Sequence, residues 1–184
     1  MSAAGDTIVD MDADLLLSID HVGVAVPDLD EAIAFYARVF GMTCVHQEEN
    51  EDQGVREAML AVGDSGDRLQ LLAPLTQEST IAGFLDRKGP GVQQVAYRVR
   101  DVTAAAQVLR DRGIRLLYDE PRRGTAGSLV NFVHPRDAGG VLMELVQPAD
   151  QSETAQIQAS DAQLVLRHSE EMDPLALSWH HNHR

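Results

Sequence analysis

The chain has 184 residues, of which 44% are hydrophobic, and this is typical of a globular protein with one large domain or two small modules. No apolar stretch approaches the roughly eighteen residues that a membrane span needs, and the first residues lack the basic and apolar regions of a signal peptide. Fifteen Lys and Arg against 29 Asp and Glu give a formal net charge of −14, which argues against nucleic acid binding because a phosphate backbone requires a basic surface. A single cysteine, Cys44, excludes an intramolecular disulfide, so we expect a cytoplasmic protein.

The first half of the chain, residues 18–75, predicts a β-α-β-β-β module. Residues 18–26 alternate, with His21, Gly23 and Ala25 on one face and three valines on the other. A helix should follow, with Asp28 as its N-cap and Gly41 after its last turn. Strands are predicted at 42–47, 55–62 and 68–72, separated by a polar loop at 48–54 and a turn at 63–67.

The same order of elements repeats over residues 91–149. A linker at 76–90 contains a short helix at about 81–88, capped by Ser79 or Thr80. Then come a strand at 92–99, a helix from 102 to 113 after Asp101, and strands at 115–118, 128–133 and 140–146. Residues 1–17 are interpreted as an N-terminal extension, and residues 150–184 as a tail whose polar first stretch favours a mobile segment.

Overlaying the two halves reveals a duplicated module. His21 falls on Gln94 and Asp28 on Asp101 at an offset of 73 residues, while Gln70 falls on Glu144 at an offset of 74. Each half therefore supplies one polar residue from its first strand and one from its last. The resulting quartet is His21, Gln70, Gln94 and Glu144.

Taken singly, the members of this quartet have ordinary explanations. A histidine near the start of a strand is usually structural, and a glutamine on a strand usually faces solvent. As a set at symmetric positions with apolar neighbours, they favour one shared buried site. One imidazole nitrogen, two amide oxygens and one carboxylate oxygen are all competent metal ligands.

Several stretches resemble the vicinal oxygen chelate superfamily, and within it the methylmalonyl-CoA epimerases. They are 19–26 (Ile-Asp-His-Val-Gly-Val-Ala-Val), 50–60 with Gln-Gly-Val-Arg-Glu-Ala-Met-Leu, 69–72, 118–124 (Tyr-Asp-Glu-Pro-Arg-Arg-Gly), 132–135 and 144–146. The likeness covers residues 17–149. It implies an α+β fold in which two paired β-α-β-β-β modules form a curved, cup-like mixed sheet around a metal site.

One position departs from the family pattern, which has a His-His pair where this chain has Gln93 and Gln94. The resemblance implies a divalent metal, which is Co, Mn, Mg or Zn, held by the quartet. Glutamine oxygen is a harder and weaker donor than imidazole, which shifts the expected preference toward Mn, Mg or Co and away from tight Zn binding.

The resemblance also implies an isomerase that interconverts the (2R) and (2S) epimers of methylmalonyl-CoA by removing the C2 proton. Glu57 is the candidate base, and the alternative is a solvent-facing glutamate paired with Arg56 or Arg68. A glutamate at the position of Glu144 has been considered as the acid on the opposite face. A metal-ligand carboxylate is a poor proton donor, however, so a bound water is a rival.

The expected partners are methylmalonyl-CoA or a related acyl-CoA and a second copy of the chain in a homodimer, with no nucleic acid and no membrane. Arg122 and Arg123 are candidates for contact with the phosphates of coenzyme A. Three further residues are candidates for the acyl pocket: Ser128, Asn131 and His134. The alternatives are a glyoxalase-I-like lyase, in which Glu57 would be dispensable, and a non-catalytic module that binds a small molecule.

Overall fold

The computed structural model describes residues 15–149; the predictions for residues before Leu15 and after Ala149, including the mobile tail, lie outside this part of the chain. In chain order its elements are β1 (Ser18–Ala25), α1 (Leu29–Phe40), β2 (Thr43–Asn50), β3 (Val55–Ala61), β4 (Arg68–Pro74), α2 (Thr80–Lys88), β5 (Gly91–Arg98), α3 (Val102–Asp111), β6 (Arg122–Arg123), the 3-10 turn η1 (Thr125–Gly127), β7 (Leu129–Val133), the 3-10 turn η2 (Pro135–Asp137) and β8 (Leu142–Gln147).

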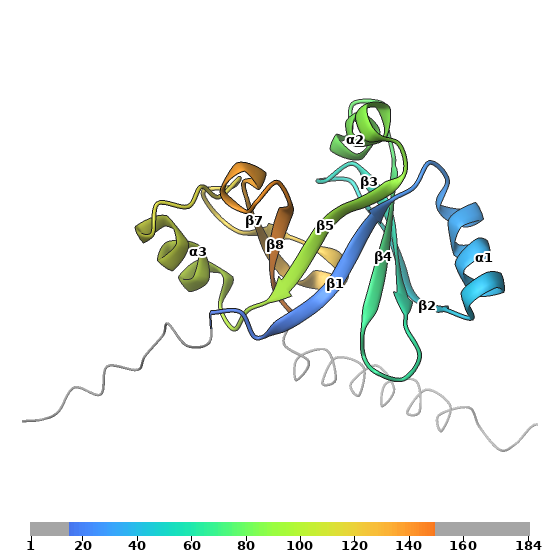
Figure 1. Ribbon diagram of the computed structural model, residues 1–184, viewed down its shortest axis with the longest axis horizontal. Helices are drawn as coiled ribbons and strands as arrows, with labels where there is room; N and C mark the ends of the chain where they lie inside the picture. The colour runs from blue at the N-terminus through green and yellow to red at the C-terminus, as the bar shows by residue number, and fades with distance from the viewer. Residues whose placement is uncertain (1–14, 150–184) are drawn as a thin grey trace, which may run out of the picture. The chain divides into compact units, whose positions relative to one another are not determined.

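All eight strands form one mixed sheet in the order β2-β3-β4-β1-β5-β8-β7-β6. The two modules meet at the centre, where β1 pairs antiparallel with β5. Each of these strands also pairs in parallel with the last strand of its own module, β1 with β4 and β5 with β8. The sheet curls (Figure 1), so the predicted α+β fold with a curved sheet built from two modules is confirmed.

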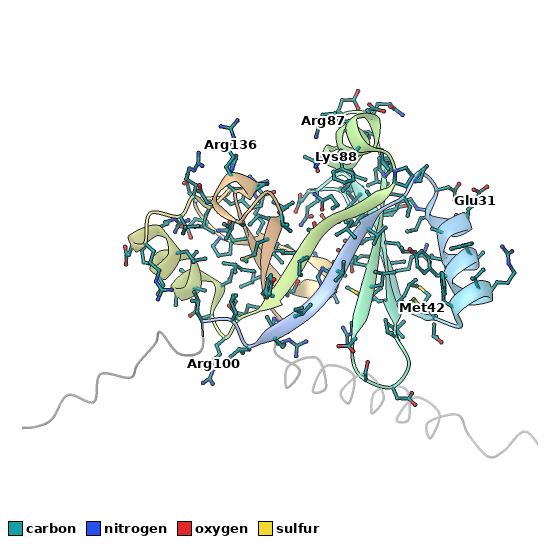
Figure 2. The ribbon with its side chains drawn as sticks, viewed as in Figure 1. Glu31, Met42, Arg87, Lys88, Arg100 and Arg136 are labelled. Carbon is teal, nitrogen blue, oxygen red and sulfur yellow. The ribbon has the colours of Figure 1, made fainter. Side chains whose placement is uncertain are left out.

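The helices leave part of one sheet face open. Helix α1 packs through Leu29 against Val26, Ala58 and Leu71, and α3 packs through Val102 and Ala105 against Leu145. Side chains at these positions of β3, β4 and β8 point away from those of Gln70 and Glu144, because successive residues of a strand face opposite sides. The polar side chains of the helices project outward, as Glu31 and Arg87 do in Figure 2. Helix α2 packs through Ile81 against Ala25 and Leu72 at one end of the inner face, and the rest of that face is left for the quartet.

The predicted N-caps of α1 and α3 and the predicted end of α1 are confirmed, whereas α3 ends at Asp111, before the predicted residue 113. The Asp28 side chain accepts a hydrogen bond from the backbone N–H of Glu31 at the start of α1, and Asp101 accepts one from Ala104 at the start of α3. Gly41 ends α1 with a φ of 67°, a left-handed conformation that glycine adopts without strain. In residues 15–149, no helix is long and apolar enough to cross a membrane.

Two local predictions are wrong. The strand expected at 115–118 is reduced to one isolated bridge between Leu116 and Val133. The carbonyl oxygen of Tyr118 accepts hydrogen bonds from the side chains of Arg110 and Asn131 instead of from a neighbouring strand. The polar loop expected from residue 48 begins later, because β2 continues to Asn50.

Candidate active site

The quartet lies in two rows that cross the centre of the sheet. In one row Gln70 of β4 and Gln94 of β5 flank Gly23 of β1, since Gly23 pairs with both. In the other row His21 of β1 and Glu144 of β8 flank Ala96 of β5. The rows are two residues apart along β1, so all four side chains emerge on the same face.

Small residues between the ligand candidates let the side chains meet. A Cβ atom added to Gly23 would lie 2.7 Å from Cγ of Gln94, so the glutamine side chain passes over the space that a larger residue would fill. Ala96 holds the corresponding position between His21 and Glu144 and is fully buried. The duplicated pattern of small and polar residues therefore forms one site from two modules.

Hydrogen bonds join the quartet into a buried network whose members are 3–6% exposed. Gln94 Nε2 donates to Glu144 Oε2 and, at 3.4 Å, to Gln70 Oε1. His21 Nε2 lies 3.4 Å from Glu144 Oε2 but has no hydrogen-bond partner among residues 15–149. The four side chains thus converge around this buried ring nitrogen.

Asp20 orients His21 and was not predicted as a site residue. Asp20 Oδ1 lies 3.0 Å from His21 Nδ1, and Arg98 donates to Asp20 Oδ2 at 2.7 Å. Consecutive strand residues normally face opposite sides, but the pairing of β1 with β5 shifts register between Ile19 and His21. A carboxylate on the second ring nitrogen fixes the tautomer of a metal-binding histidine.

These contacts shift the pKa values of both Asp20 and His21. Burial raises the pKa of Asp20, but the hydrogen bonds with His21 and Arg98 outweigh it and bring the value to about 2. Burial lowers the pKa of His21, but the carboxylates of Asp20 and Glu144 outweigh it and raise the value to about 9. The carboxylates of Asp20 and Glu144 therefore favour a positive charge at His21.

Glu57 of β3 lies beside the quartet and is 2% exposed. Its Oε2 accepts a hydrogen bond from Gln70 Nε2 at 2.8 Å, while its Oε1 is buried and has no hydrogen-bond partner within the described part of the chain. Burial raises the pKa of Glu57 to about 8, against a hydrogen bond with Thr125 that lowers it, and repulsion by Glu48 adds to the rise. The alternative of a solvent-facing ion pair is wrong, since Arg56 instead pairs with Asp30 and Glu49.

A loop from the second module closes over this part of the first. Gln70 Nε2 donates to Thr125 Oγ1 at 2.8 Å, and the backbone N–H of Ala126 donates to Glu48 Oε2 at 3.2 Å. Gln53 Nε2 donates to the carbonyl oxygen of Arg123 at 3.4 Å. No sequence periodicity marks Thr125, so this cross-module contact appears only in the structure.

The five candidate substrate residues lie in different places in the structure and differ in burial. Arg122 and Arg123 are exposed on β6, with the Arg122 guanidinium 3.8 Å from the centre of the Tyr118 ring. Ser128 is buried between η1 and β7. His134 accepts a hydrogen bond from the backbone N–H of Arg136 and caps η2.

Asn131 does not line the face that carries the quartet, contrary to the prediction. It pairs with Leu145 in the sheet, whereas Phe132 pairs with Glu144, so Asn131 points toward the side covered by α3. Its amide is fully buried and bonds with the backbone of Tyr118 on both its oxygen and its nitrogen. Asn131 therefore braces the 115–119 segment.

The quartet fits a divalent cation once its amide oxygens are counted as donors. Among residues 15–149, no three His, Cys, Asp or Glu side chains group closely enough to hold a metal, so the two glutamines must supply half of the donors. The buried Nε2 of His21 is the free nitrogen donor. Rotation of the Gln94 amide exchanges its oxygen and nitrogen positions and directs the oxygen toward Glu144 and Gln70, which its nitrogen now contacts. One nitrogen and three oxygens make a hard donor set.

Comparison with known proteins defines the family. The sequence model of the Glyoxalase/Bleomycin resistance protein/Dioxygenase superfamily matches residues 20–132, a stretch that includes three members of the quartet and Glu57. The chain belongs to this superfamily. The match spans the first module and continues into β7 of the second.

Similar proteins within the superfamily are methylmalonyl-CoA epimerases. The crystal structure of the enzyme from Mycobacterium tuberculosis is 54% identical, with a TM-score of 0.74 over 77% of this chain and 95% of that chain. A Streptomyces coelicolor variant in complex with 2-nitronate-propionyl-CoA is 46% identical, with a TM-score of 0.71 over 73% and 99%. The Cereibacter sphaeroides ethylmalonyl-CoA/methylmalonyl-CoA epimerase is 37% identical over 131 residues, 70% of this chain and 96% of that relative. The resemblance in the sequence is confirmed.

Proposed function

We propose that this protein is a methylmalonyl-CoA epimerase that interconverts the (2R) and (2S) epimers through proton removal at C2. The observation that carries the proposal is Glu57, a buried carboxyl with one unpaired oxygen beside a converging quartet of metal-ligand types. Identities of 46–54% to solved epimerases, one of them bound to a substrate analogue, support the same reaction.

The reaction requires a base that removes a weakly acidic proton next to a thioester and a carboxylate. Glu57 suits this task because its burial keeps the pKa near 8, close to the range in which a general base works at neutral pH. Gln70 holds one carboxyl oxygen, and the other is free to take the proton. The substrate therefore has to present C2 to Glu57 Oε1.

The four side chains proposed to hold the cation are His21, Gln70, Gln94 and Glu144. Bound by these residues, a divalent cation would supply Lewis acidity for the negative charge that develops on the thioester oxygen. Asp20 keeps His21 oriented with Nε2 toward the site. The donor set favours Mn, Co or Mg over tightly bound Zn.

The proton on the opposite face has two candidate sources, Glu144 and a bound water. Glu144 accepts a hydrogen bond from Gln94 and lies 3.4 Å from His21, so its carboxylate is already engaged in the quartet. A carboxylate that also binds a cation is a weak proton donor, which favours water held near Glu144. Glu144 then acts by positioning that water.

The coenzyme A portion of the substrate is assigned to the exposed Arg122 and Arg123 on β6, where guanidinium groups can bind phosphates through paired hydrogen bonds. These arginines directly precede the loop in which Thr125 contacts Gln70 and Ala126 contacts Glu48. The acyl end would meet the apolar inner face of the second module, formed by Val130, Phe132 and Val146. The homodimer and the cytoplasmic location remain predictions.

The test is a C2 exchange assay on methylmalonyl-CoA in deuterium oxide, with the protein supplied with Co²⁺, Mn²⁺ or no metal. Deuterium at C2 and interconversion of the epimers are expected with added metal. No exchange under any of the three conditions would contradict the proposal. Turnover of a hemithioacetal without C2 exchange of methylmalonyl-CoA would favour the lyase alternative, and binding without turnover of either would favour the non-catalytic module.

A further inference from the structure

Two titratable side chains on the edge strand β2 lead from Glu57 to solvent. Glu48 of β2 pairs directly with Glu57 of β3, so both carboxyls lie on the inner face. His46 lies two residues before Glu48 and shares that face. Exposure rises along the series, from 2% for Glu57 to 22% for the Glu48 side chain and 38% for the His46 side chain.

Direct contacts connect the series. His46 Nε2 and Glu48 Oε2 are 2.5 Å apart. Glu48 and Glu57 lie directly opposite each other on β2 and β3, which places their side chains side by side. The Glu48 pKa is lowered although its partial burial raises it, because His46 and the backbone N–H of Ala126 stabilise the carboxylate.

The backbone at Ala126 adds an independent sign that Glu48 is held in place. Ala126 has a φ of 53°, and it is the one non-glycine residue of the described chain with a positive φ. This conformation is strained for alanine, and here it aims an N–H group at Glu48 Oε2. The loop of the second module thus adopts a strained backbone that fixes Glu48, a carboxylate that is neither a member of the quartet nor the proposed base.

A buried base needs such a connection. If Glu57 removes a proton from one face of C2 and another group returns a proton to the opposite face, Glu57 ends each turnover protonated. At 2% exposure it cannot release that proton directly to bulk water. A route to solvent has to pass through a neighbouring acid–base group.

We propose that Glu48 and His46 form a proton relay between Glu57 and solvent, an inference that rests on the proposed function. The Glu57 O–H bond breaks as an O–H bond forms on Glu48. The proton then passes from Glu48 Oε2 to His46 Nε2, and the exposed imidazolium releases a proton to water. Glu57 and Glu48 end ionised, His46 ends neutral, and one proton has moved to solvent. Both relay residues act through Glu57 and touch no substrate.

The relay can be separated from a purely structural role by isotope partitioning in deuterium oxide. Start with the protiated epimer whose C2 proton Glu57 removes, using the metal-loaded protein. The product takes deuterium from the opposite face, whereas recovered substrate gains deuterium only if Glu57 exchanges its proton before returning it. The ratio of deuterium in recovered substrate to deuterium in product therefore measures how quickly Glu57 equilibrates with solvent.

We expect Glu48→Gln and His46→Gln to lower this ratio about fivefold or more from that epimer and to leave it unchanged from the opposite epimer. Glu49→Gln is the matched control, since Glu49 is the next residue of β2, lies on the other face and pairs with Arg56. A ratio equal to wild type in either relay variant would overturn the relay, and so would an equal fall from both epimers, which indicates general disturbance. Absence of C2 exchange in the wild type would overturn the proposed function itself.

Discussion

The outer strands of the two modules occupy equivalent places but differ in length and chemistry. In the first module β3 carries Glu57, which pairs with Leu72, two residues beyond Gln70. In the second module the matching position on β7 is Val130, which pairs with Val146, two residues beyond Glu144. In the next strand outward, Glu48 pairs with Glu57, and Arg122 pairs with Val130.

This difference between the outer strands suggests different roles for the two modules in the proposed reaction. The four central strands supply a nearly symmetric quartet, two polar residues from each module. Acid–base groups occur on the outer strands of the first module, whereas the second offers an apolar wall and arginines at the same places. In the proposed function, the duplicated fold holds a cation symmetrically while a base on one side removes the proton.

The largest effect on the symmetric part is expected from His21→Gln, which removes the sole nitrogen donor of the quartet. We expect Co²⁺ affinity to fall by about 100-fold, because amide oxygen replaces imidazole and the support from Asp20 is lost. Isothermal titration calorimetry with Co²⁺ measures it. Affinity within twofold of wild type would show that His21 is not a ligand.

A smaller change of opposite sign is expected from Gln94→His, which adds a second nitrogen donor from the other module. Co²⁺ affinity should rise on the order of tenfold in the same titration. Val92→His is the control, because Val92 of β5 is exposed and pairs with Val24, which faces the other side of the sheet from Gly23. Combining His21→Gln with Gln94→His moves the nitrogen from one module to the other and should restore much of the lost affinity. No recovery in the double variant would contradict the symmetric quartet.

The close approach of the modules is tested by Gly23→Ala. The added Cβ would lie 2.7 Å from Gln94 Cγ and 3.3 Å from Leu72 Cδ1, so the Gln94 side chain has to move. We expect a loss of about 1–3 kcal/mol in the free energy of unfolding, as for other overpacked positions, together with weaker Co²⁺ binding. Gly91→Ala on β5 is the control, since no atom of the residues that the structure describes lies within 4 Å of its added Cβ. Equal effects of the two substitutions would refute the steric account.

The smallest effect concerns an ion pair in the second module, remote from the quartet. Arg115 holds the pKa of Asp137 well below its usual range through hydrogen bonds from its side chain and its backbone N–H. Because the pKa is depressed in the folded state, the pair stabilises the protein above the unfolded pKa of about 4 and loses that contribution as pH falls further. The difference in Tm between wild type and Asp137→Asn should therefore shrink as pH is lowered from 6 to 2. A difference independent of pH would contradict this role.

The sequence predicted the centre of the molecule better than its edges. Alternation along residues 18–26 and the repeated offsets were enough to bring His21, Gln70, Gln94 and Glu144 to one face, because strand geometry makes that placement a matter of counting. Asp20 was not predicted as a site residue because a register shift in β1 breaks the alternation beside His21. Residue counting has no means of locating such an irregularity.

The prediction that a loop begins at residue 48 was wrong for a related reason. Its composition is typical of a loop, but pairing with β3 keeps Glu48 and Asn50 in the strand. Thr125 and Ala126 carry no periodic signal, and their contacts with Gln70 and Glu48 join residues far apart in the chain. These tertiary contacts connect the base to its surroundings, and they depend on the loop geometry after β6.

The most direct test of the division between the modules is Glu57→Gln, measured for both C2 exchange and Co²⁺ affinity. Replacing the base in the first module while keeping the quartet intact should reduce deuterium incorporation at C2 of methylmalonyl-CoA by about 100-fold or more. Co²⁺ affinity should remain within about threefold of wild type, because Glu57 contacts Gln70 without belonging to the quartet. C2 exchange at a near wild-type rate in this variant would contradict the account.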